Sequence, residues 1–241
     1  MYKSIVIAIA AMLGISSASA DGLKRYNINV KDFHELRVIE GLKVNYVCND
    51  DSAGIASFVT EPELASVLMF TNNKNRLDIQ ISTDGIDYDN LPLITVYSRF
   101  LTKVENSGDS LVKVLSLKPT PKFQARLIGN GRLAIHGIDA SNIDASLETG
   151  NGTMHLQGKA GKASLKAVGT GSIQADEMQA DDVNCTLLGT GYIGCEPVKS
   201  LNVKGVNGKV YYRGTPAKIK NHSLGVKLIP LDENSAPIEE K

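Results

Sequence analysis

The sequence predicts an all-β fold, a parallel β-helix or solenoid with coils of about 20 residues. A Gly-x-Gly turn that recurs at nearly constant spacing predicts the stacked coils. Alternating apolar and polar residues after each turn predict that the coils are built from strands. The turns are Gly129-Asn130-Gly131, Gly150-Asn151-Gly152, Gly169-Thr170-Gly171 and Gly189-Thr190-Gly191, and their second glycines are 21, 19 and 20 residues apart.

The residues that follow each turn define the buried face of a coil. Counted from the second glycine, the second residue is apolar in every copy, whereas the first and third are mostly polar or small. This period of two is typical of a strand with one face in water. Before the turns, Leu165 of one copy matches Cys185 of the next, so a second strand in each coil packs on the same core. The apolar residues at the second position are Leu133, Met154, Ile173, Ile193 and Val210.

The turn glycines have a structural explanation. A coil must change direction between two strands, and glycine adopts a positive φ without steric cost. A phosphate-binding loop is not expected, because no helical pattern follows any of the turns. The calcium-binding nonapeptide repeat is not expected either, because no copy carries its adjacent glycines with an Asp at the required spacing. We therefore expect no cofactor and no metal at these turns.

Residues 21–231 are expected to form one β-helical domain, which is less regular up to about residue 119 and has regular Gly-x-Gly coils from about residue 120. In the less regular part, Glu61-Pro62-Glu63 predicts at most one short helix. This part and the segment from Tyr211 to Pro230 are expected to cap the two ends of the solenoid. Residues 232–241 are expected to be a flexible tail. The strands expected before residue 119 are Tyr26 to Val30, Leu36 to Val47, Arg76 to Ser82, Leu93 to Ser98 and Leu111 to Leu117.

The N-terminus predicts export. Lys3 is followed by an apolar run from Ile5 to Ile15 and then by Ala18-Ser19-Ala20, so residues 1–20 are typical of a signal peptide that is cleaved before Asp21. No cysteine lies at the cleavage point, so a lipoprotein is not expected. No later stretch has the roughly 20 apolar residues of a transmembrane helix, so no membrane insertion is expected. The predicted location is the periplasm, the cell surface or the medium.

The composition argues against several classes of partner. Lys plus Arg and Asp plus Glu both number 26, so the whole chain carries no formal net charge that would attract nucleic acid or an anionic membrane. Aromatic residues make up 5% of the chain and Trp is absent. Hydrophobic residues at 42% and charged residues at 22% are ordinary for a globular domain.

Several motifs occur in a fixed order along the chain. They are Phe33-x-x-Leu-x-Val, Leu77-x-Ile-x-Ile, Val96-Tyr97-Ser98 leading to Asn106-Ser107-Gly108, the Gly-x-Gly turns, and Val210-Tyr211-Tyr212-Arg213-Gly214-Thr215-Pro216. In their order and spacing, more than in any single motif, the chain resembles the putative auto-transporter adhesin, head GIN domain family over roughly residues 30 to 229. The resemblance implies a secreted bacterial protein with right-handed parallel β-helical coils and implies no established activity.

Two histidines are candidates for a ligand surface. His136 and His155 lie five and three residues after their glycines on adjacent coils, so both are expected to point outward on one sheet face. A shared metal ion would normally need a third ligand and hydrogen-bonded support for each ring. Solvated surface histidines are therefore the expected state, and no metal site is predicted.

Tyr192 and Tyr211 form a second candidate surface. They occupy the first and third positions after neighbouring turns, so their rings are expected to lie diagonally adjacent on the outer face. Such a pair either stabilises the stack of coils or offers a platform to a sugar or a partner side chain. Stabilisation of the stack is the favoured interpretation.

Clustered carboxylates offer the alternative of catalysis. Asp176, Glu177, Asp181 and Asp182 lie near one expected corner, and glycosidases use paired carboxylates as acid and base. The absence of Trp and the low aromatic content argue against a sugar-lined cleft. A noncatalytic protein is predicted.

Cys185 and Cys195 are both expected to point inward in one coil. They either fill the core as small apolar groups or form a disulfide outside the cytoplasm, provided that the opposite walls of the coil are close enough. Cys48 is left without a partner, and no Cys-x-x-Cys motif indicates zinc or redox chemistry.

The sequence therefore predicts a secreted, noncatalytic, adhesin-like binding module for a glycan or another cell-surface component. An envelope protein that assembles with itself, as a homo-oligomer, is the alternative, since a parallel solenoid exposes strand edges at its ends. A carbohydrate-active β-helix enzyme is the third hypothesis.

Overall fold

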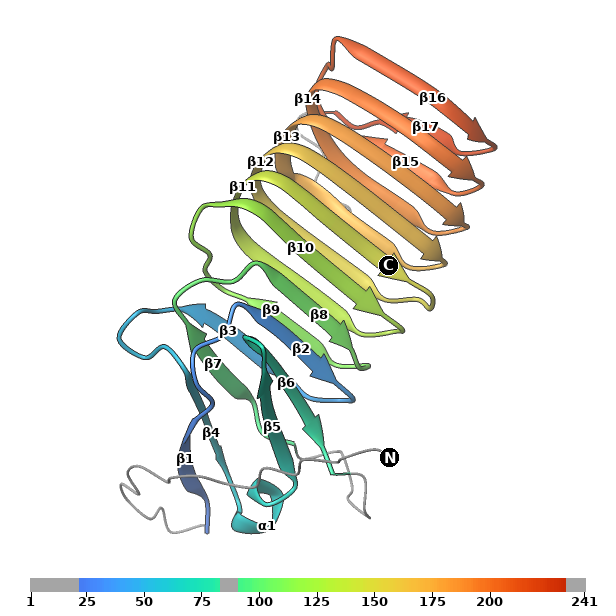
Figure 1. The fold of residues 1–241 in the computed structure, drawn as a ribbon. Coiled ribbons are helices and arrows are strands. Elements are labelled where there is room, and N and C mark those ends of the chain that lie inside the picture. The colour runs from blue at the N-terminus through green and yellow to red at the C-terminus, as the bar shows by residue number, and fades with distance from the viewer. Residues whose placement is uncertain (1–21, 83–90, 233–241) are drawn as a thin grey trace, which may run out of the picture.

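The computed structural model describes residues 22–82 and 91–232. The predicted signal peptide, residues 1–20, and the predicted tail from residue 233 onward lie outside the described residues. The described part is all β apart from one helical turn, and its 17 strands join into one continuous sheet. Figure 1 shows that this sheet winds into a stack of parallel coils, which confirms the predicted β-solenoid.

Four long strands form the regular part of the stack and pair in parallel with one another. Each begins directly after a Gly-x-Gly turn, bends in the middle, and runs to the next turn (Figure 1). The register is irregular at the bend, for example between His155 and Gln157. The four strands are β11 (Arg132–Glu148), β12 (Thr153–Gly169), β13 (Ser172–Gly189) and β14 (Tyr192–Val206).

The bend divides every coil between two sheet faces, which we call wall 1 and wall 2. Wall 1 contains the segments that follow the turns, and wall 2 contains the segments that precede them. Shorter strands extend both walls in the same register. Wall 1 adds β3 (Val44–Cys48), β7 (Ile94–Ser98), β9 (Leu111–Val114), β15 (Lys209–Tyr212) and β17 (Lys227–Pro230). Wall 2 adds β2 (Glu35–Ile39), β6 (Arg76–Ile81), β8 (Lys103–Ser107), β10 (Thr120–Ile128) and β16 (Lys218–Leu224).

The core lies between the two walls and is built from stacked columns of apolar side chains. Leu165 pairs with Cys185 in wall 2 and Ile173 with Ile193 in wall 1, so like positions of successive coils lie over one another. All four residues are buried. Because successive side chains along a strand point to opposite faces, the residues between these columns point outward and form rows on the outer surface.

Successive Gly-x-Gly turns are in direct backbone contact with one another. The Gly191 amide donates to the Gly169 carbonyl oxygen at 3.2 Å, and the Tyr192 amide donates to the Gly171 carbonyl oxygen at 3.3 Å. A Cβ on Gly191 would lie 2.0 Å from the Gly171 carbonyl oxygen. The turn therefore needs glycine because successive backbones touch, which agrees with a structural role for these glycines.

The N-terminal end of the stack is closed by antiparallel strands. One strand pairs antiparallel with β6 on wall 2, and another pairs antiparallel with β7 on wall 1. The less regular first part of the chain therefore caps the solenoid, as predicted. The elements of the cap are β1 (Lys24–Asn29), β4 (Ile55–Thr60), α1 (Pro62–Ala65) and β5 (Leu68–Asn73).

The C-terminal segment does not form the predicted cap. β15 and β16 pair in parallel with β14, and β17 pairs in parallel with β15, so Tyr211 to Pro230 adds further coil to the stack. Within the described residues, β16 and β17 are the last strands of their walls.

The single helix agrees with the prediction. It spans Pro62–Ala65, with proline in the first turn and Glu63 as its acidic residue. The strand expected from Leu36 to Val47 is interrupted, because Glu40 has a positive φ and divides it into β2 and β3.

Candidate functional site

The candidate site is a band of polar and aromatic side chains on the outside of wall 1, which spans three neighbouring outward rows and which we call the outer ladder. Its members come from β11 to β15, at the outward positions just after the Gly-x-Gly turns and at the bend. The coils are about 4.8 Å apart, so neighbouring members can touch along the axis of the solenoid. The outer ladder consists of His136, His155, Gln157, Gln174, Glu177, Tyr192 and Tyr211.

The structure brings the two histidines together. The ring centroids of His136 and His155 are 6.2 Å apart and their planes are inclined at 54°. Each ring has its own hydrogen-bond partner: His136 Nδ1 lies 2.9 Å from Gln157 Oε1, and His155 Nε2 lies 3.0 Å from Glu177 Oε2. Both histidines are half-buried, so the partners fix the orientation of rings that still reach solvent.

The donor set does not fit a metal ion. Among the described residues, no group of three or more His, Cys, Asp or Glu side chains converges closely enough to hold one. His136 and His155 are instead bonded to an amide and a carboxylate on the next coil. This part of the outer ladder can donate and accept hydrogen bonds.

The two tyrosines touch, as the register predicts, but they are not equally exposed. Tyr192 is only 9% exposed, and Gln174 Nε2 donates to its hydroxyl oxygen at 2.8 Å. Gly194 lies between Gln174 and Tyr211 in the register, so no side chain separates these two residues along their row. Tyr211 is half-buried and packs on Tyr192 from outside. A sugar or a partner side chain can therefore reach Tyr211 but not the face of Tyr192.

The carboxylates near the bend do not form a pair that faces substrate. Each of them is engaged by a different neighbour, and Asp176, which is 2% exposed, lies inside the structure. A glycosidase needs two carboxyl groups that flank one bond in a shared cleft. The pairs are Asp176 with Arg213 at 3.3 Å, Glu177 with His155 at 3.0 Å, Asp181 with Lys199 at 2.9 Å, and Asp182 with Ser200 at 2.6 Å.

Cys185 and Cys195 point into the core from opposite walls of one coil and are both buried thiols. Cys195 also lies 3.5 Å from the Tyr211 carbonyl oxygen. A hydrogen bond with Cys185 and burial raise the pKa of the Cys195 thiol well above its ordinary value. Cys48 lies apart from them and donates to the Arg99 carbonyl oxygen at 3.0 Å. In this structure the two buried thiols fill core space.

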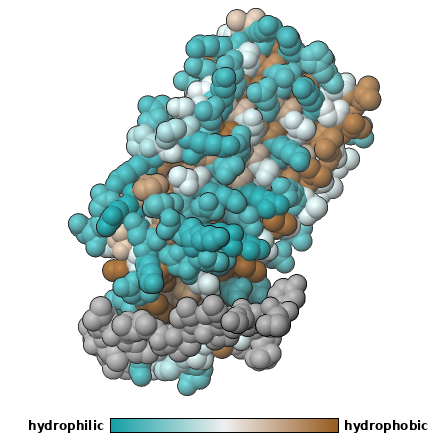
Figure 2. Space-filling model, viewed as in Figure 1, coloured by the Kyte–Doolittle hydropathy of each residue, from teal (hydrophilic) through white to brown (hydrophobic). Residues whose placement is uncertain are grey.

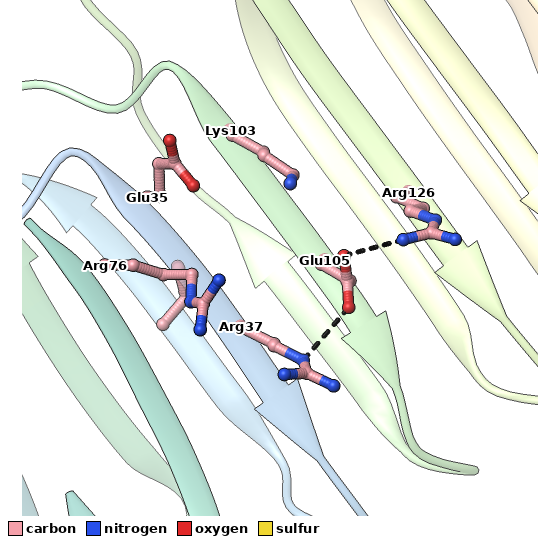
Figure 3. Close-up of a pocket in the computed structure, with 7 residues that line it drawn as sticks. Glu35, Arg37, Arg76, Lys103, Glu105 and Arg126 are labelled. Carbon is pink, nitrogen blue, oxygen red and sulfur yellow. Dashed lines mark hydrogen bonds and ion pairs between the residues drawn. The ribbon is translucent and has the colours of Figure 1, made fainter. Parts of the chain in front are cut away.

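A second cluster of functional groups lies in a shallow hollow on wall 2 near the N-terminal end (Figure 3). Charges of opposite sign alternate across four neighbouring strands. Glu105, which is 6% exposed, lies between Arg37 and Arg126, at 3.0 and 3.4 Å from their guanidinium groups. The charged residues that line the hollow are Glu35, Arg37, Arg76, Lys103, Glu105 and Arg126.

Most charged side chains of the hollow form ion pairs or hydrogen bonds with side chains of opposite charge. Arg126 Nη2 also lies 2.5 Å from Glu148 Oε2, and this hydrogen bond lowers the pKa of the Glu148 carboxyl group. Arg76 forms hydrogen bonds of 2.9 and 3.1 Å with Asp78. The hollow is therefore an ion-pair network that ties β2, β8, β10 and β11 together. Once Asp78 and Glu148 are included, it lacks the excess of one sign that would attract a charged ligand.

The sequence analysis missed this hollow. Its strands have no 20-residue repeat, and their neighbours in wall 2 come from distant parts of the chain. A signal was present, because opposite charges recur two residues apart around a buried apolar residue. The segments are Glu35-Leu36-Arg37, Arg76-Leu77-Asp78 and Lys103-Val104-Glu105.

Fold and site together define a class, namely a parallel β-solenoid with an antiparallel N-terminal cap and ordered outward rows of side chains. The chain belongs to the family described as "Putative auto-transporter adhesin, head GIN domain" (DUF2807), whose model matches residues 32–216. The resemblance stated from the motifs is thereby confirmed. No protein with a curated function matches the chain.

Several solved structures share the fold. A putative adhesin from Bacteroides fragilis has a TM-score of 0.80 at 20% identity, covering 88% of this chain and 97% of that one. A putative lipid binding protein from Parabacteroides distasonis has a TM-score of 0.68 at 19% identity, with 88% and 98% covered. A putative adhesin from Parabacteroides merdae has a TM-score of 0.66 at 18% identity, with the same coverage. At these identities the likeness shows the fold alone.

The described helical structure can also be compared with what a transmembrane helix requires. Within residues 22–82 and 91–232, none of the helical structure has the length and apolar character needed to span a bilayer.

Proposed function

We propose that the protein is an exported, noncatalytic binding module with an adhesin-like role, and that the outer ladder holds a glycan of a cell surface. The observation that carries this proposal is the continuity of the ladder across five strands. His136, Gln157 and Tyr211 offer donors, acceptors and an accessible ring at a spacing of about 4.8 Å per coil. A row of this kind suits an extended polymer of repeating hydroxyl groups.

The family supports the adhesin-like role, since its description and two of the solved relatives refer to adhesins. It also supports a location at the cell surface or outside the cell. Export through cleavage before Asp21 belongs to the proposal, and intact mass measurement of the exported protein tests it. The proposal would be wrong on this point if the protein in the medium or periplasm retained residues 1–20.

The noncatalytic assignment is supported by the engaged carboxylates. Asp176 is buried against Arg213, and Glu177 is bonded to His155, so the two neighbours in sequence serve different partners. An assay for hydrolysis of the glycans that bind would contradict the assignment if it detected turnover that Glu177→Gln abolishes.

Self-assembly is a second candidate function, favoured by the C-terminal end of the stack. β16 is the last strand of wall 2 among the described residues, and nearly all its side chains are exposed. Unpaired strand edges are templates for pairing with another chain. Lys218 and Lys220 on this strand oppose such pairing, as lysines on edge strands generally do. For this reason ligand binding remains the first choice.

A glycan array tests the proposed function. Three proteins are compared: the wild type, the ladder variant Tyr211→Ala/His155→Ala, and the control variant Tyr97→Ala/His222→Ala, which removes the same residue types elsewhere. We expect binding by the wild type and the control and loss of binding by the ladder variant. Binding by all three would move the site away from the outer ladder. No binding by folded wild type would favour self-assembly, which light scattering over a range of concentrations then measures.

A further inference from the structure

An exposed apolar row follows the corner where wall 2 meets the Gly-x-Gly turns. It consists of the residue that precedes the turn in each of the last four coils. Val168 pairs with Leu188, Leu188 with Val206, and Val206 with Leu224. Val168 is half-buried, whereas Leu188 is 43% exposed, Val206 46% and Leu224 76%. Figure 2 shows apolar atoms gathered along this edge, where strands β13, β14 and β16 end in Figure 1.

Lysines flank the apolar row on both sides. Lys166 and Lys204 occupy the next outward row of wall 2, two residues before the apolar row. Lys209 and Lys227 occupy the first outward row of wall 1, just past the turns, where they pair with each other in the register. All four are exposed, and none forms an ion pair within the part of the chain that the structure describes. We call the four apolar residues and these four lysines the turn ridge.

The turn ridge contains no carboxylate. The chain segments that carry its eight residues are 166–172, 186–192, 204–209 and 222–227, and they include neither Asp nor Glu. Glu148 marks its boundary, because it pairs with Val168 in the register and is held by Arg126. The formal net charge of zero therefore conceals an uneven distribution of charge. The arginines of the hollow form ion pairs with carboxylates, whereas none of the four ridge lysines forms an ion pair with a described carboxylate, although the charge of Lys166 helps to lower the pKa of Glu148. The net charge of the whole chain, from which no attraction to an anionic membrane was expected, does not describe this local excess of lysine.

We propose that the turn ridge is a peripheral binding surface for a bilayer that contains anionic lipids. Four aliphatic side chains in a line of about 14 Å can enter the boundary between head groups and acyl chains. The lysines on either side can extend their charges to the head-group phosphates while their aliphatic stems lie along the apolar row. The solenoid would then lie with its axis along the membrane and its turns toward it.

A second copy of this chain fits the turn ridge less well. A symmetric contact would place the lysines of one ridge against those of the other, with no carboxylate on either side to compensate. A purely apolar partner would leave the four lysines without counter-charges. An anionic bilayer supplies both the apolar interior and the negative charge. The turn ridge adjoins the outer ladder, since Lys209 pairs with Tyr192 in the register, but the proposal uses other residues and does not depend on glycan binding.

Co-sedimentation with vesicles tests the proposal. One set of vesicles mixes phosphatidylglycerol with phosphatidylcholine, and the other contains phosphatidylcholine alone. We expect the protein to sediment with the first set only, and we expect this binding to weaken as salt is raised. Binding to neither set, or equal binding to both sets at all salt concentrations, would overturn the proposal.

Two ridge variants and two matched controls locate the surface. Lys204→Gln/Lys227→Gln should weaken binding at least about tenfold, because each lysine near an anionic surface contributes a few-fold. Leu188→Ser/Leu224→Ser should abolish sedimentation. The controls remove equal charge or apolar area elsewhere, at Lys24→Gln/Lys113→Gln and Leu93→Ser/Leu115→Ser, and should bind like the wild type.

Folding and self-association are measured on the same samples. The single variant Leu224→Ser changes a side chain that is 76% exposed, so it should unfold at the wild-type temperature and still bind more weakly. Equal loss of binding in ridge and control variants would contradict the proposal. So would a dimer in light scattering that the ridge variants dissociate, since a second copy would then be the occupant.

Discussion

The ring of Tyr211 meets the ring of Tyr192 edge-on, with centroids 5.7 Å apart and planes inclined at 89°. Tyr192 is the inner member of the pair, and Gln174 holds its hydroxyl oxygen at 2.8 Å. Tyr211 is the outer member. The two rings therefore have different roles: the inner ring supports the stack of coils, and the outer ring is available for binding. The sequence alone did not distinguish these roles.

Substitutions of the two tyrosines should separate these roles. Tyr192→Phe removes the hydroxyl that Gln174 contacts and should lower the free energy of unfolding by about 1 kcal/mol. Tyr192→Ala should lower it by about 3 kcal/mol, since a buried ring is lost. Tyr211→Phe should change it by less than about 0.5 kcal/mol. Urea unfolding measures all three, and equal effects of Tyr192→Phe and Tyr211→Phe would contradict the assignment.

The turn glycines should tolerate no side chain. Gly191→Ala places a Cβ 2.0 Å from the Gly171 carbonyl oxygen, so neighbouring coils must separate. We expect a loss of about 2 kcal/mol or more in stability. Gly41→Ala is the control, because its Cβ would meet nothing within 4 Å. Thermal unfolding compares the two, and a Gly191→Ala protein as stable as the control would show that the turns are loosely packed.

Thiol titration should distinguish the three cysteines. Because the pKa of the Cys195 thiol is raised, its thiolate is suppressed at neutral pH and its labelling should increase only as the pH rises above the ordinary value of about 8.5. Its contribution to stability is correspondingly present below that pH and lost as the pH rises through the folded pKa. In native protein we expect a thiol reagent at neutral pH to modify Cys48 alone. Rapid native labelling of Cys195 would contradict its burial.

The same titration tests the proposal that Cys185 and Cys195 form a disulfide after export. If the bond forms, denatured exported protein exposes Cys48 alone, and reduction releases the other two thiols. Three reactive thiols in the denatured protein before reduction would show that the pair only fills the core.

The ion pair between Arg126 and Glu148 should contribute to stability at neutral pH and not in acid. The pKa of Glu148 is lowered in the folded state, so its contribution is present above the unfolded pKa of about 4.3 and is lost as the pH falls through the folded pKa. The side chains are 39% and 35% exposed, so screening keeps the effect to a few tenths of a kcal/mol.

A variant pair measures this pH dependence. Glu148→Gln should reduce the acid sensitivity of the unfolding midpoint slightly, whereas Glu63→Gln on the exposed helix should leave it unchanged. An identical pH profile for the wild type and Glu148→Gln would mean that the pair is not formed in solution.

The regular coils were predictable because their signal is local and repeated. The Gly-x-Gly turns and the alternation of residues such as Ile173 and Ile193 define both the strand direction and the register. The adjacency of His136 with His155 and of Tyr192 with Tyr211 followed from that register. The burial of Tyr192 did not, since it involves contacts with the ring of Tyr211 and the side chain of Gln174.

The N-terminal part was less predictable for a physical reason. Alternation marks a half-buried strand in parallel and antiparallel sheets alike, so β1 gave no sign that it runs antiparallel to β4. The expected strands did not include β4, β5 or β8. β8 is polar, and the carbonyl oxygens of Ser110 and Arg132 accept hydrogen bonds of 2.9 Å from its buried Asn106. The charged hollow was missed with it.

The central claim is that the outer ladder serves binding while the glycine turns and inward columns serve the fold. The most direct test is the dissociation constant for the best array glycan, measured for the wild type and for Tyr211→Ala/His155→Ala at matched thermal stability. The account predicts a rise of at least about tenfold, or 1.4 kcal/mol, in the ladder variant and no change in Tyr97→Ala/His222→Ala. An unchanged constant in the ladder variant would contradict it.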